Sequence, residues 1–418
     1  MANNLLTSSI IANSAVMILK NQLAFSSNVN RQYDSSFAVT GAKAGDTVNI
    51  RKPARYIGVT GPNLAVEDTY QSSIPLQLTT QFHVDTSFST KDLALSLNDF
   101  NDNIVAPAMA AIGNKIDRDG LIMAKNAVAN TVGVAGTPPT SLLTYLNAQA
   151  YLNAEGTPGF DKRQCVIEPF TSAAIVDGLK GLFLPQAQVT SQYQKGLMGR
   201  DSAGMDWRMD QNVVAQTYGA WTTAPGTLTA NTSVNAAFLT SGWAASSTIV
   251  LANSAALTLQ QGDTITIANV FGVNPQNRQS YGKLRNFLVN AAATAAIGTI
   301  SISVSPAIIT QGQFQNVTIP IASATAAVTP FSIAGTAATA VTSPQNLVYH
   351  KNAFTLACAD LELPSGLAFG ARTSDSASGV SIRLIRDYTI NNDALPARFD
   401  VLYGWLAIYP EMACRVAA

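Results

Sequence analysis

The sequence predicts an α+β fold into which a small all-β domain, a barrel or sandwich, is inserted. Apolar residues recur at helical spacing from Leu97 to about Ala129, and helix-like and strand-like patterns alternate between Pro138 and Gln216. Between residues 223 and 346 the pattern changes to short alternating runs separated by turn residues. Because the α+β pattern resumes after this stretch, we interpret the stretch as a domain inserted into another.

The first 88 residues predict an arm followed by a long β-hairpin. Thr7–Leu23 has the apolar spacing of a helix, and the polar stretch Ser26–Asp34 is interpreted as a flexible lead. Strand-like patterns over Thr47–Ile57 and Ser72–Asp85 flank the turn-rich segment Gly58–Asp68, which predicts a hairpin with a mobile tip. Since a two-stranded hairpin alone is marginal in water, this one needs a surface to lie on.

The long helix is the strongest helical pattern in the chain. Ser89–Asp92 supplies a plausible helix start, and Pro107 is expected to kink or split the helix. Its apolar residues recur at four-residue steps at Phe100, Ile104, Ala108, Ile112 and Ile116. Further elements are expected as a helix from Thr140 to Gly156, a strand at Cys165–Glu168, a helix at Thr171–Leu182 and strands at Val380–Ile385 and Arg398–Ile408.

The inserted stretch is almost free of charge. Between residues 223 and 346 the charged side chains are Asp263, Arg278, Lys283 and Arg285. Its surface must therefore stay soluble through hydroxyl and amide groups. The runs that predict its strands are Ser247–Leu251, Asp263–Ile267, Thr299–Val304 and Val317–Ile321.

Composition excludes several classes of protein. The 418 residues carry 25 Lys plus Arg and 25 Asp plus Glu, and only 12% of residues are charged, about half of the usual ~25%. Without a basic excess the chain cannot coat DNA through counterion release, and 47% hydrophobic residues argue against disorder. No apolar run has the length of a membrane span, and the N-terminus lacks the basic region of a signal peptide. Cys165, Cys358 and Cys414 are expected to be free thiols in a reducing cytoplasm.

Candidate catalytic and metal-binding residues do not assemble into a site in the sequence. His83 and His350 have no second ligand at metal-binding spacing, so a structural role is expected. Asp117–Gly120 fails the calcium-loop pattern and is interpreted as a solvated helix face with local ion pairs. Asp99 and Asp102 lie one turn apart near a helix start, where acidic residues are common. We therefore predict no catalytic, cofactor-binding or metal-binding residues.

Charges on the hairpin are the candidate contacts between subunits. Arg51, Lys52 and Arg55 lie on the first strand, and Glu67 and Asp68 lie just beyond the tip of the hairpin. The two groups could form an ordinary solvated strand face. They could equally provide charge complementarity with a neighbouring copy of the chain, which would fix the register of the contact. Both interpretations remain open at this point.

Several fragments, in this order and spacing, resemble the major capsid proteins of tailed bacteriophages. The nearest likeness is to coat proteins of short-tailed phages that carry an inserted β-barrel domain, and it covers essentially the whole chain. The fragments are Val29–Tyr33, Asn49–Pro53, Phe88–Thr90, Asp99–Phe100, Pro107–Ala108, Asp117–Leu121, Met209–Asn212, Phe354–Ala357 and Asp400–Trp405.

The resemblance implies a capsid-type division of the chain, with a loop that reaches over an adjacent subunit and an axial domain at capsomer centres. The implied segments are an N-arm (1–46), an extended β-hairpin loop (47–88), a spine helix of a peripheral domain (89–129), a first axial part (130–222), the inserted β-barrel domain (223–346), a second axial part (347–380) and C-terminal strands of the peripheral domain (381–418).

The resemblance also implies a function and its partners. The chain would be a structural protein, not an enzyme, that assembles as pentamers and hexamers into an icosahedral shell around double-stranded DNA. Its partners would be many copies of itself, a scaffolding protein and a portal, with loose contact to packaged DNA and no membrane. It would be made and assembled in the bacterial host cytoplasm and reside in the virion, without a cofactor.

One departure from the related coat proteins concerns the inserted domain. In related coats a loop of this domain carries acidic residues that contact neighbouring capsomers, whereas Asp263 is the only acidic residue of this stretch. Hydrogen bonds or apolar contacts would have to replace those ion pairs. The Lys–Asn isopeptide cross-link of some members of the wider fold is not assigned to any pair here.

A β-rich surface or carbohydrate-binding module is the alternative, suggested by the inserted stretch alone. A hydrolase that uses Asp99 or Asp102 is a more distant one. The carbohydrate-binding alternative predicts exposed aromatic side chains among Trp243, Phe271, Tyr281, Phe287, Phe314 and Phe331.

Overall fold

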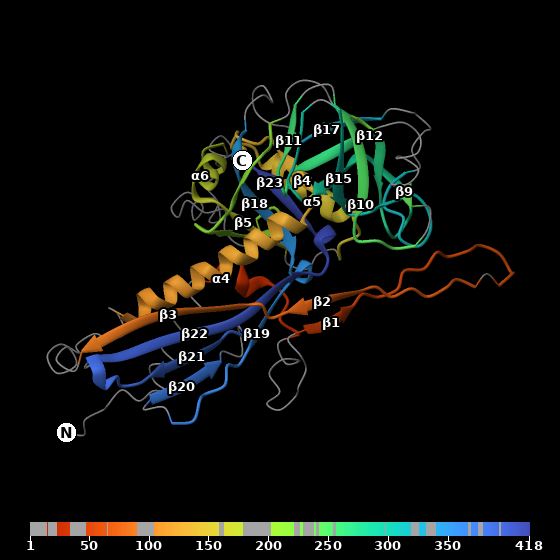
Figure 1. Ribbon diagram of the computed structural model, residues 1–418. Coiled ribbons are helices and arrows are strands. Elements are labelled where there is room, and N and C mark those ends of the chain that lie inside the picture. The colour runs from red at the N-terminus through yellow and green to blue at the C-terminus, as the bar shows by residue number, and fades with distance from the viewer. Residues whose placement is uncertain are drawn as a thin grey trace. The chain divides into compact units, whose positions relative to one another are not determined.

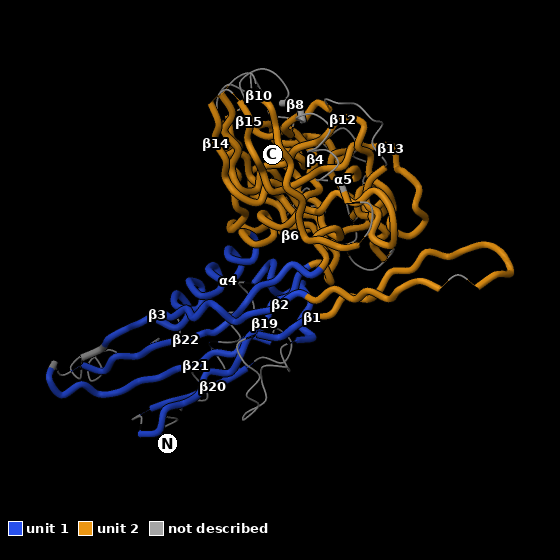
Figure 2. Tube along the Cα trace, turned by 45° about the vertical axis from the view of Figure 1, so that its right-hand side comes forward, with its two compact units in different colours: residues 1–50, 74–121, 354–408 blue, residues 51–73, 122–353, 409–418 orange. Residues whose placement is uncertain are grey.

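The computed structural model divides the chain into two compact units (Figure 2). Unit 1 contains residues 1–50, 74–121 and 354–408, and unit 2 contains residues 51–73, 122–353 and 409–418. Each unit is described by itself below. The structure describes residues 15, 23–33, 47–64, 66–89, 104–158, 163–178, 202–220, 226–228, 238–239, 242–253, 256–296, 298–318, 326–331, 340–366, 369–374, 379–392 and 394–418.

Unit 1 is built on a five-stranded sheet whose longest strand is β22 (Ala394–Ala407). This strand pairs in antiparallel fashion with β3 (Thr80–Ser89), β19 (Phe354–Ala359) and β21 (Ser381–Arg386). Strand β20 (Phe369–Ser374) pairs with β21 at the edge of the sheet (Figure 1). Strand β22 therefore joins β3, which is distant in the sequence, to β19 and β21, which precede it more closely.

Helix α4 (Ala106–Ala127) is the long helix that the apolar spacing predicts. Its buried residues include Met109, Ile112 and Ile116, each with no exposed surface, so they form one apolar face. Pro107 lies in the first turn, where a missing N–H leaves no helical hydrogen bond unmade. The expected start of the helix, before residue 104, lies outside the described residues.

Unit 2 contains a six-stranded sheet covered by α5 (Leu142–Ala154). Tyr145, Ala148 and Leu152 of this helix are fully buried in one cluster with residues of the sheet. Its N-cap is Ser141, whose side chain accepts the Leu143 N–H at 3.2 Å. A second helix of the unit is α6 (Pro169–Gly178). The strands, in sheet order, are β4 (Thr131–Gly133), β23 (Ala413–Ala417), β18 (Thr342–His350), β5 (Arg163–Ile167) and β6 (Met205–Met209), and β7 (Ala215–Thr217) pairs with β18.

A closed six-stranded barrel lies in the charge-poor stretch of unit 2 (Figure 1). Strands β7 and β18, which pair with each other, flank it in sequence, so the chain leaves the sheet and returns to the same place. A bulge in β12, where Asn269 has a φ of 63°, interrupts the register and lets the strand bend. The barrel strands, in order, are β10 (Ser247–Asn253), β15 (Gly298–Ser305), β13 (Ser280–Val289), β12 (Thr264–Val273), β17 (Ala327–Pro330) and β8 (Gly226–Leu228).

The barrel has its own apolar core. Alternate residues of its strands, such as Ile249 and Leu251 of β10, point inward and are fully buried. Two short strand pairs come from segments between the barrel strands: β11 (Leu257–Leu259) pairs with β14 (Ala293–Ala295), and β9 (Phe238–Leu239) pairs with β16 (Ile308–Ile309). The mixture of helix and sheet in the two units agrees with the predicted α+β class.

Several predicted boundaries are wrong in detail. The strand expected over Thr47–Ile57 ends at Arg51, and the one over Ser72–Asp85 is two strands, separated at residues 78–79. The cap of α5 is Ser141 instead of Thr140, because Ser141 has the extended backbone that an N-cap requires. In the run Val317–Ile321, Val317 makes only an isolated bridge, and residues 319–321 lie outside the described part. The helix expected over Thr7–Leu23 also lies outside it, except for helical Ala15 and the described Leu23.

Candidate assembly surfaces

The hairpin has a paired base and a long loop that has almost no backbone pairing. Strands β1 (Thr47–Arg51) and β2 (Ser73–Gln77) form the base, and the Lys52 N–H donates to the Ser72 carbonyl at 2.8 Å. Further out, the Glu67 carboxylate accepts the Ile57 N–H at 2.8 Å. The loop over residues 52–72 is therefore held by a few contacts instead of a continuous ladder.

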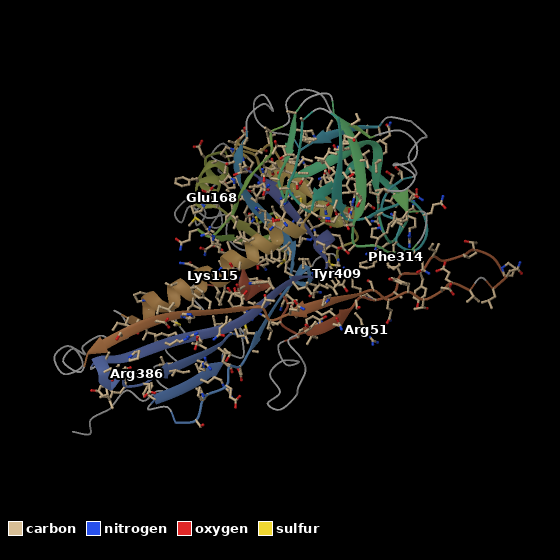
Figure 3. The ribbon with its side chains drawn as sticks, in the orientation of Figure 1. Arg51, Lys115, Glu168, Phe314, Arg386 and Tyr409 are labelled. Carbon is tan, nitrogen blue, oxygen red and sulfur yellow. The ribbon has the colours of Figure 1, made fainter. Side chains whose placement is uncertain are left out.

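The five charged residues predicted to contact another subunit have different surroundings in the structure. Lys52 and Arg55 are partly buried against other residues of the same chain, and Glu67 is tied across the loop to a backbone N–H. Arg51 and Asp68 are exposed, and their side chains have no ion-pair partner among the described residues. Figure 3 places Tyr409 on one side of the hairpin and the Arg51 side chain on the other.

Lys52 and Arg55 belong to a small cluster with Tyr409 and Glu411. The Lys52 ammonium lies 5.1 Å from the centre of the Tyr409 ring, and Arg55 forms an ion pair with Glu411 at 3.4 Å. Burial lowers the pKa of Lys52, and Arg55 lowers it further, while Glu411 raises it. Two of the five charges are thus already used within the chain, which the sequence alone did not indicate.

Several large apolar side chains are exposed on the hairpin loop. Leu64 is 90% exposed, Val66 is 83% exposed and Val59 is 64% exposed. A shallow depression is lined by Tyr56, Ile57, Val59, Asn63, Leu64 and Glu67. We call the apolar residues Tyr56, Ile57, Val59, Leu64 and Val66 the hairpin tip. The charge pattern did not predict this tip, although several apolar residues within a turn-rich segment were the available signal.

In unit 1 a buried carboxylate holds residues 24–26 in the N-terminal part of the chain. Asp117 of α4 has no exposed surface and accepts backbone N–H groups from Ala24 at 2.8 Å, Phe25 at 3.1 Å and Ser26 at 3.0 Å. It also accepts the Ser26 hydroxyl. We call this arrangement the Asp117 anchor. Since Ser26 is buried and hydrogen-bonded to Asp117, the interpretation of a flexible lead is wrong for this residue.

Packing around Phe25 explains the small residue next to the anchor. The Phe25 ring stacks on Trp405 with centroids 5.3 Å apart, and the Trp405 indole donates to the Ile116 carbonyl at 3.1 Å. A Cβ on Gly120 would come within 2.8 Å of both rings, so only glycine leaves room for them on the helix. Asp117 and Gly120 therefore form a buried contact, so the predicted solvated face is wrong for Asp117, whereas Arg118 is exposed. Its local ion pair does exist, because Lys115 contacts Asp119 at 2.6 Å.

Within unit 2, buried arginines connect the barrel to the sheet and its helix. Arg285 of β13 pairs with Glu155 at the end of α5, and both side chains are 4% exposed. Burial lowers the pKa of Arg285 to about 10, so the guanidinium still carries its charge near neutral pH. Arg415 of β23 is fully buried and donates to the carbonyl of Gly262 at 2.9 Å and to the hydroxyl of Thr264.

Asp263, the only acidic residue of the barrel stretch, is 4% exposed, and its carboxylate makes hydrogen bonds inside the protein. Its carboxylate accepts the Gln260 N–H at 2.8 Å, the Gly219 N–H at 3.0 Å and the Gln216 amide at 2.9 Å. Burial raises its pKa, and these hydrogen bonds oppose the shift. Asp263 therefore cannot supply an ion pair on the barrel surface.

The residues considered for catalysis or metal binding form no site in the described part. His83 contacts Asp85 at 2.9 Å, and buried His350 accepts the Asn352 N–H at 3.3 Å. Asp99 and Asp102 lie outside the described residues. Among the described residues, no group of three His, Cys, Asp or Glu side chains could hold a metal ion. No described helix has the length and apolar character to span a membrane.

A family model described as "P22 coat protein - gene protein 5" matches residues 1–415. The chain belongs to this family. It is thus a structural major capsid protein of a tailed phage, not an enzyme, and its copies associate into the icosahedral shell of the virion. The search of curated proteins found no match.

Solved structures similar to this coat protein include three from phages. One is titled "Mycobacterium phage Che8" (11% identity, TM-score 0.45, covering 95% of this chain and 90% of that chain). Another is "Capsid of Ralstonia phage GP4" (9% identity, TM-score 0.43, covering 93% and 91%). A third is "Asymmetric unit of bacteriophage PhiM1 mature capsid" (10% identity, TM-score 0.41, covering 93% and 87%).

Proposed function

We propose that the coat protein assembles as pentamers and hexamers around double-stranded DNA, and that the hairpin loop makes contacts between subunits. The observation that carries this proposal is the exposed hairpin tip. Apolar residues such as Leu64 and Val66 are placed on a thin loop where they bury almost no surface within their own chain. A patch of this kind is stabilised when another copy covers it.

The segments take the roles that the family resemblance implies. Residues 1–46 would be the N-arm, 47–88 the extended loop and 89–129 the spine helix of the peripheral domain, which residues 381–418 complete. Residues 130–222 and 347–380 would form the axial domain, and 223–346 the inserted β-barrel domain. Support comes from the closed barrel between the paired strands β7 and β18 and from the long helix α4.

The inserted barrel would contact its neighbours without ion pairs. Asp263 and Arg285, two of the four charged residues in this stretch, are buried, so Arg278 and Lys283 remain to give the barrel surface charge. Hydroxyl and amide groups would therefore dominate any contact that the barrel makes between capsomers.

A scaffolding protein and a portal are the other protein partners that we propose, with synthesis and assembly in the host cytoplasm. Contact with packaged DNA would be loose, because the chain has no net charge and a sequence pI near 6.7. A neutral subunit displaces few counterions from phosphate groups, so it gains little electrostatic free energy from DNA.

Weak individual contacts suffice for such a shell. Burying one Leu or Val side chain contributes about 1.5–3 kcal/mol, and a subunit repeats its contacts with several neighbours at once. Once one contact has formed, the next forms at a high effective concentration, so the shell is far more stable than any single contact.

The proposal is tested with the double variant Leu64→Ser/Val66→Ser, with Asn63→Ser in the same loop as its control. Both proteins are purified as free subunits, mixed with a scaffolding partner and examined by negative-stain microscopy. We expect the double variant to melt like the parent protein and to form few closed particles, while Asn63→Ser assembles normally. Deleting Gly58–Asp68 should likewise leave a folded subunit that does not assemble.

Three outcomes would contradict the proposal. If the double variant forms shells as readily as the parent, the hairpin tip is not a contact between subunits. If the deletion lowers the melting temperature and assembly survives, the loop belongs to the fold of its own subunit. A parent protein that stays monomeric with every scaffolding partner would refute assembly itself.

The carbohydrate-binding alternative is not favoured by the structure. A glycan platform needs exposed aromatic rings, but Phe287 is fully buried, Phe331 stacks on Tyr218 and Tyr281 packs against Tyr151. The other three candidates, Trp243, Phe271 and Phe314, are only partly exposed.

A further inference from the structure

The outer part of the hairpin gains support from outside its own two strands. Beyond Lys52 and Ser72, the described contacts across the loop are two, the Ile57 N–H to Glu67 and the Tyr56 hydroxyl to the Thr69 hydroxyl at 3.2 Å. A long two-stranded ribbon with so few cross-links has no fixed direction by itself. Some other surface must therefore set the direction in which the loop extends.

A loop of the barrel supplies that surface in the same subunit. The Gln313 amide donates to the Asp68 carbonyl at 2.6 Å, and the Phe314 ring meets Tyr70 edge-on with centroids 5.8 Å apart. The Arg55 guanidinium lies 6.0 Å from the centre of the Phe314 ring. Both sides of the hairpin are thus contacted, since Arg55 precedes the tip and Asp68 and Tyr70 follow it. In Figure 3, Phe314 lies beside the hairpin on the barrel side.

The barrel loop is itself held firmly. Arg278 donates to the carbonyl of Gly312 at 2.7 Å and to that of Gln313 at 2.8 Å. The Asn316 side chain accepts the Ile309 N–H at 3.0 Å and donates to the Ala307 carbonyl at 2.7 Å. A fork of two hydrogen bonds from one guanidinium fixes orientation as well as position. Residues 310–316 therefore form a pre-organised support for the hairpin.

We propose that barrel residues 310–316, which we call the cradle, position the hairpin of their own subunit for assembly. The inference rests on the proposed contact role of the hairpin tip. It assigns Gln313 and Phe314 as positioning residues, and it gives the barrel a part in assembly that requires no charge on its surface. Pre-organising the loop reduces the ordering entropy that each contact between subunits would otherwise cost.

The direct test compares Gln313→Ala/Phe314→Ala with Gln276→Ala in the full-length free subunit. Gln276 is a matched control, because its amide also leaves the barrel to donate to a main-chain carbonyl, that of Gly156 at 3.3 Å. Spin labels on Thr60→Cys and Lys283→Cys report the distance between hairpin and barrel. The described native cysteines are buried, so the labels go to the new sites. We expect a narrow distance distribution in the parent and the control, and a broad one in the double variant.

A second measurement gives the size of the effect. Tryptic cleavage after Arg55 follows the population in which the hairpin has left the cradle. Loss of one hydrogen bond and one aromatic pair should raise the initial cleavage rate roughly tenfold. If the double variant damages the barrel, Tyr70→Ala removes the same ring contact from the hairpin side and should raise cleavage without touching the barrel.

Assembly assays separate this inference from the proposed function. A released hairpin together with slower shell formation supports both. A released hairpin with normal shell formation would overturn the part of the cradle in assembly, while the contact role of the hairpin is decided separately by Leu64→Ser/Val66→Ser. Unchanged distances and cleavage in both Gln313→Ala/Phe314→Ala and Tyr70→Ala would overturn the cradle, whatever happens to assembly.

Discussion

Replacing Asp117 by Asn should release residues 24–26 from the Asp117 anchor. The two carboxylate oxygens accept three backbone N–H groups and one hydroxyl. Asn keeps the shape but has one acceptor oxygen, so its amide NH₂ must face at least one buried backbone donor. An unsatisfied buried donor costs about 1–3 kcal/mol, and the remaining bonds lose the extra strength of a charged acceptor. We therefore expect the anchor to weaken by about 2–4 kcal/mol.

Hydrogen exchange of the Phe25 and Ser26 amides measures this loss directly. A weakening of about 2–4 kcal/mol corresponds to exchange that is roughly 30- to 700-fold faster. The matched control is Asp119→Asn on the same helix, where Asp119 is partly exposed and accepts the Tyr403 hydroxyl at 2.7 Å. This control should change the exchange of residues 25 and 26 by less than about threefold. Equal exchange in the two variants would refute the reasoning, because the carboxylate would then not hold the segment.

Three further predictions concern unit 2. Arg415→Met should lower the free energy of unfolding, measured in urea, by about 3 kcal/mol, because buried acceptors lose their donor. Arg372→Met on the surface should lower it by less than about 1 kcal/mol. Similar losses in the two variants would contradict the role of Arg415. Burial raises the pKa of the Cys165 and Cys414 thiols, so Ellman's reagent should reach them only after denaturation, and rapid reaction of the native subunit would be evidence against it. Burial also raises the pKa of Asp263 above 3.8. Between the pKa of the unfolded chain and that of the folded chain, the folded state keeps a proton that the unfolded chain has lost. The free energy of unfolding that this group contributes therefore falls as pH rises through this range. The change in unfolding free energy from pH ~4 to ~7 should be more positive in Asp263→Asn than in the parent, and an unchanged difference would contradict the assignment.

Local patterns explain which parts of the fold were predictable. Ile112 and Ile116 recur at helical spacing, and both are buried on α4. In strands β10 and β15, the alternating pattern lies within one short run of residues, so each run alone is enough to predict its strand. Elements defined by their own periodicity can be predicted without knowledge of their neighbours.

The candidate site depended on partners far away in the sequence and was predicted only in part. Arg55 meets Glu411 across 356 residues, and the Asp117 anchor joins residues more than ninety apart. An acidic residue on a helix looks like a solvated face until the segment that covers it is known. The apolar character of Leu64 was visible in the sequence, but only the structure places it on an exposed loop.

Arg415 also constrains the order in which unit 2 can be completed during synthesis. Arg415 donates to the Gly262 carbonyl, and Gly262 is synthesised 153 residues before Arg415. The barrel strands are therefore made, and can close around their own apolar core, well before the guanidinium that joins them to the sheet exists. Until β23 arrives, the barrel has to persist as a nascent domain that lacks this connection. Until then the barrel groups that Arg415 will bind, the Gly262 carbonyl and the Thr264 hydroxyl, lack this donor. Slower elongation over this last stretch should therefore lengthen the time in which chaperones can bind the incomplete unit.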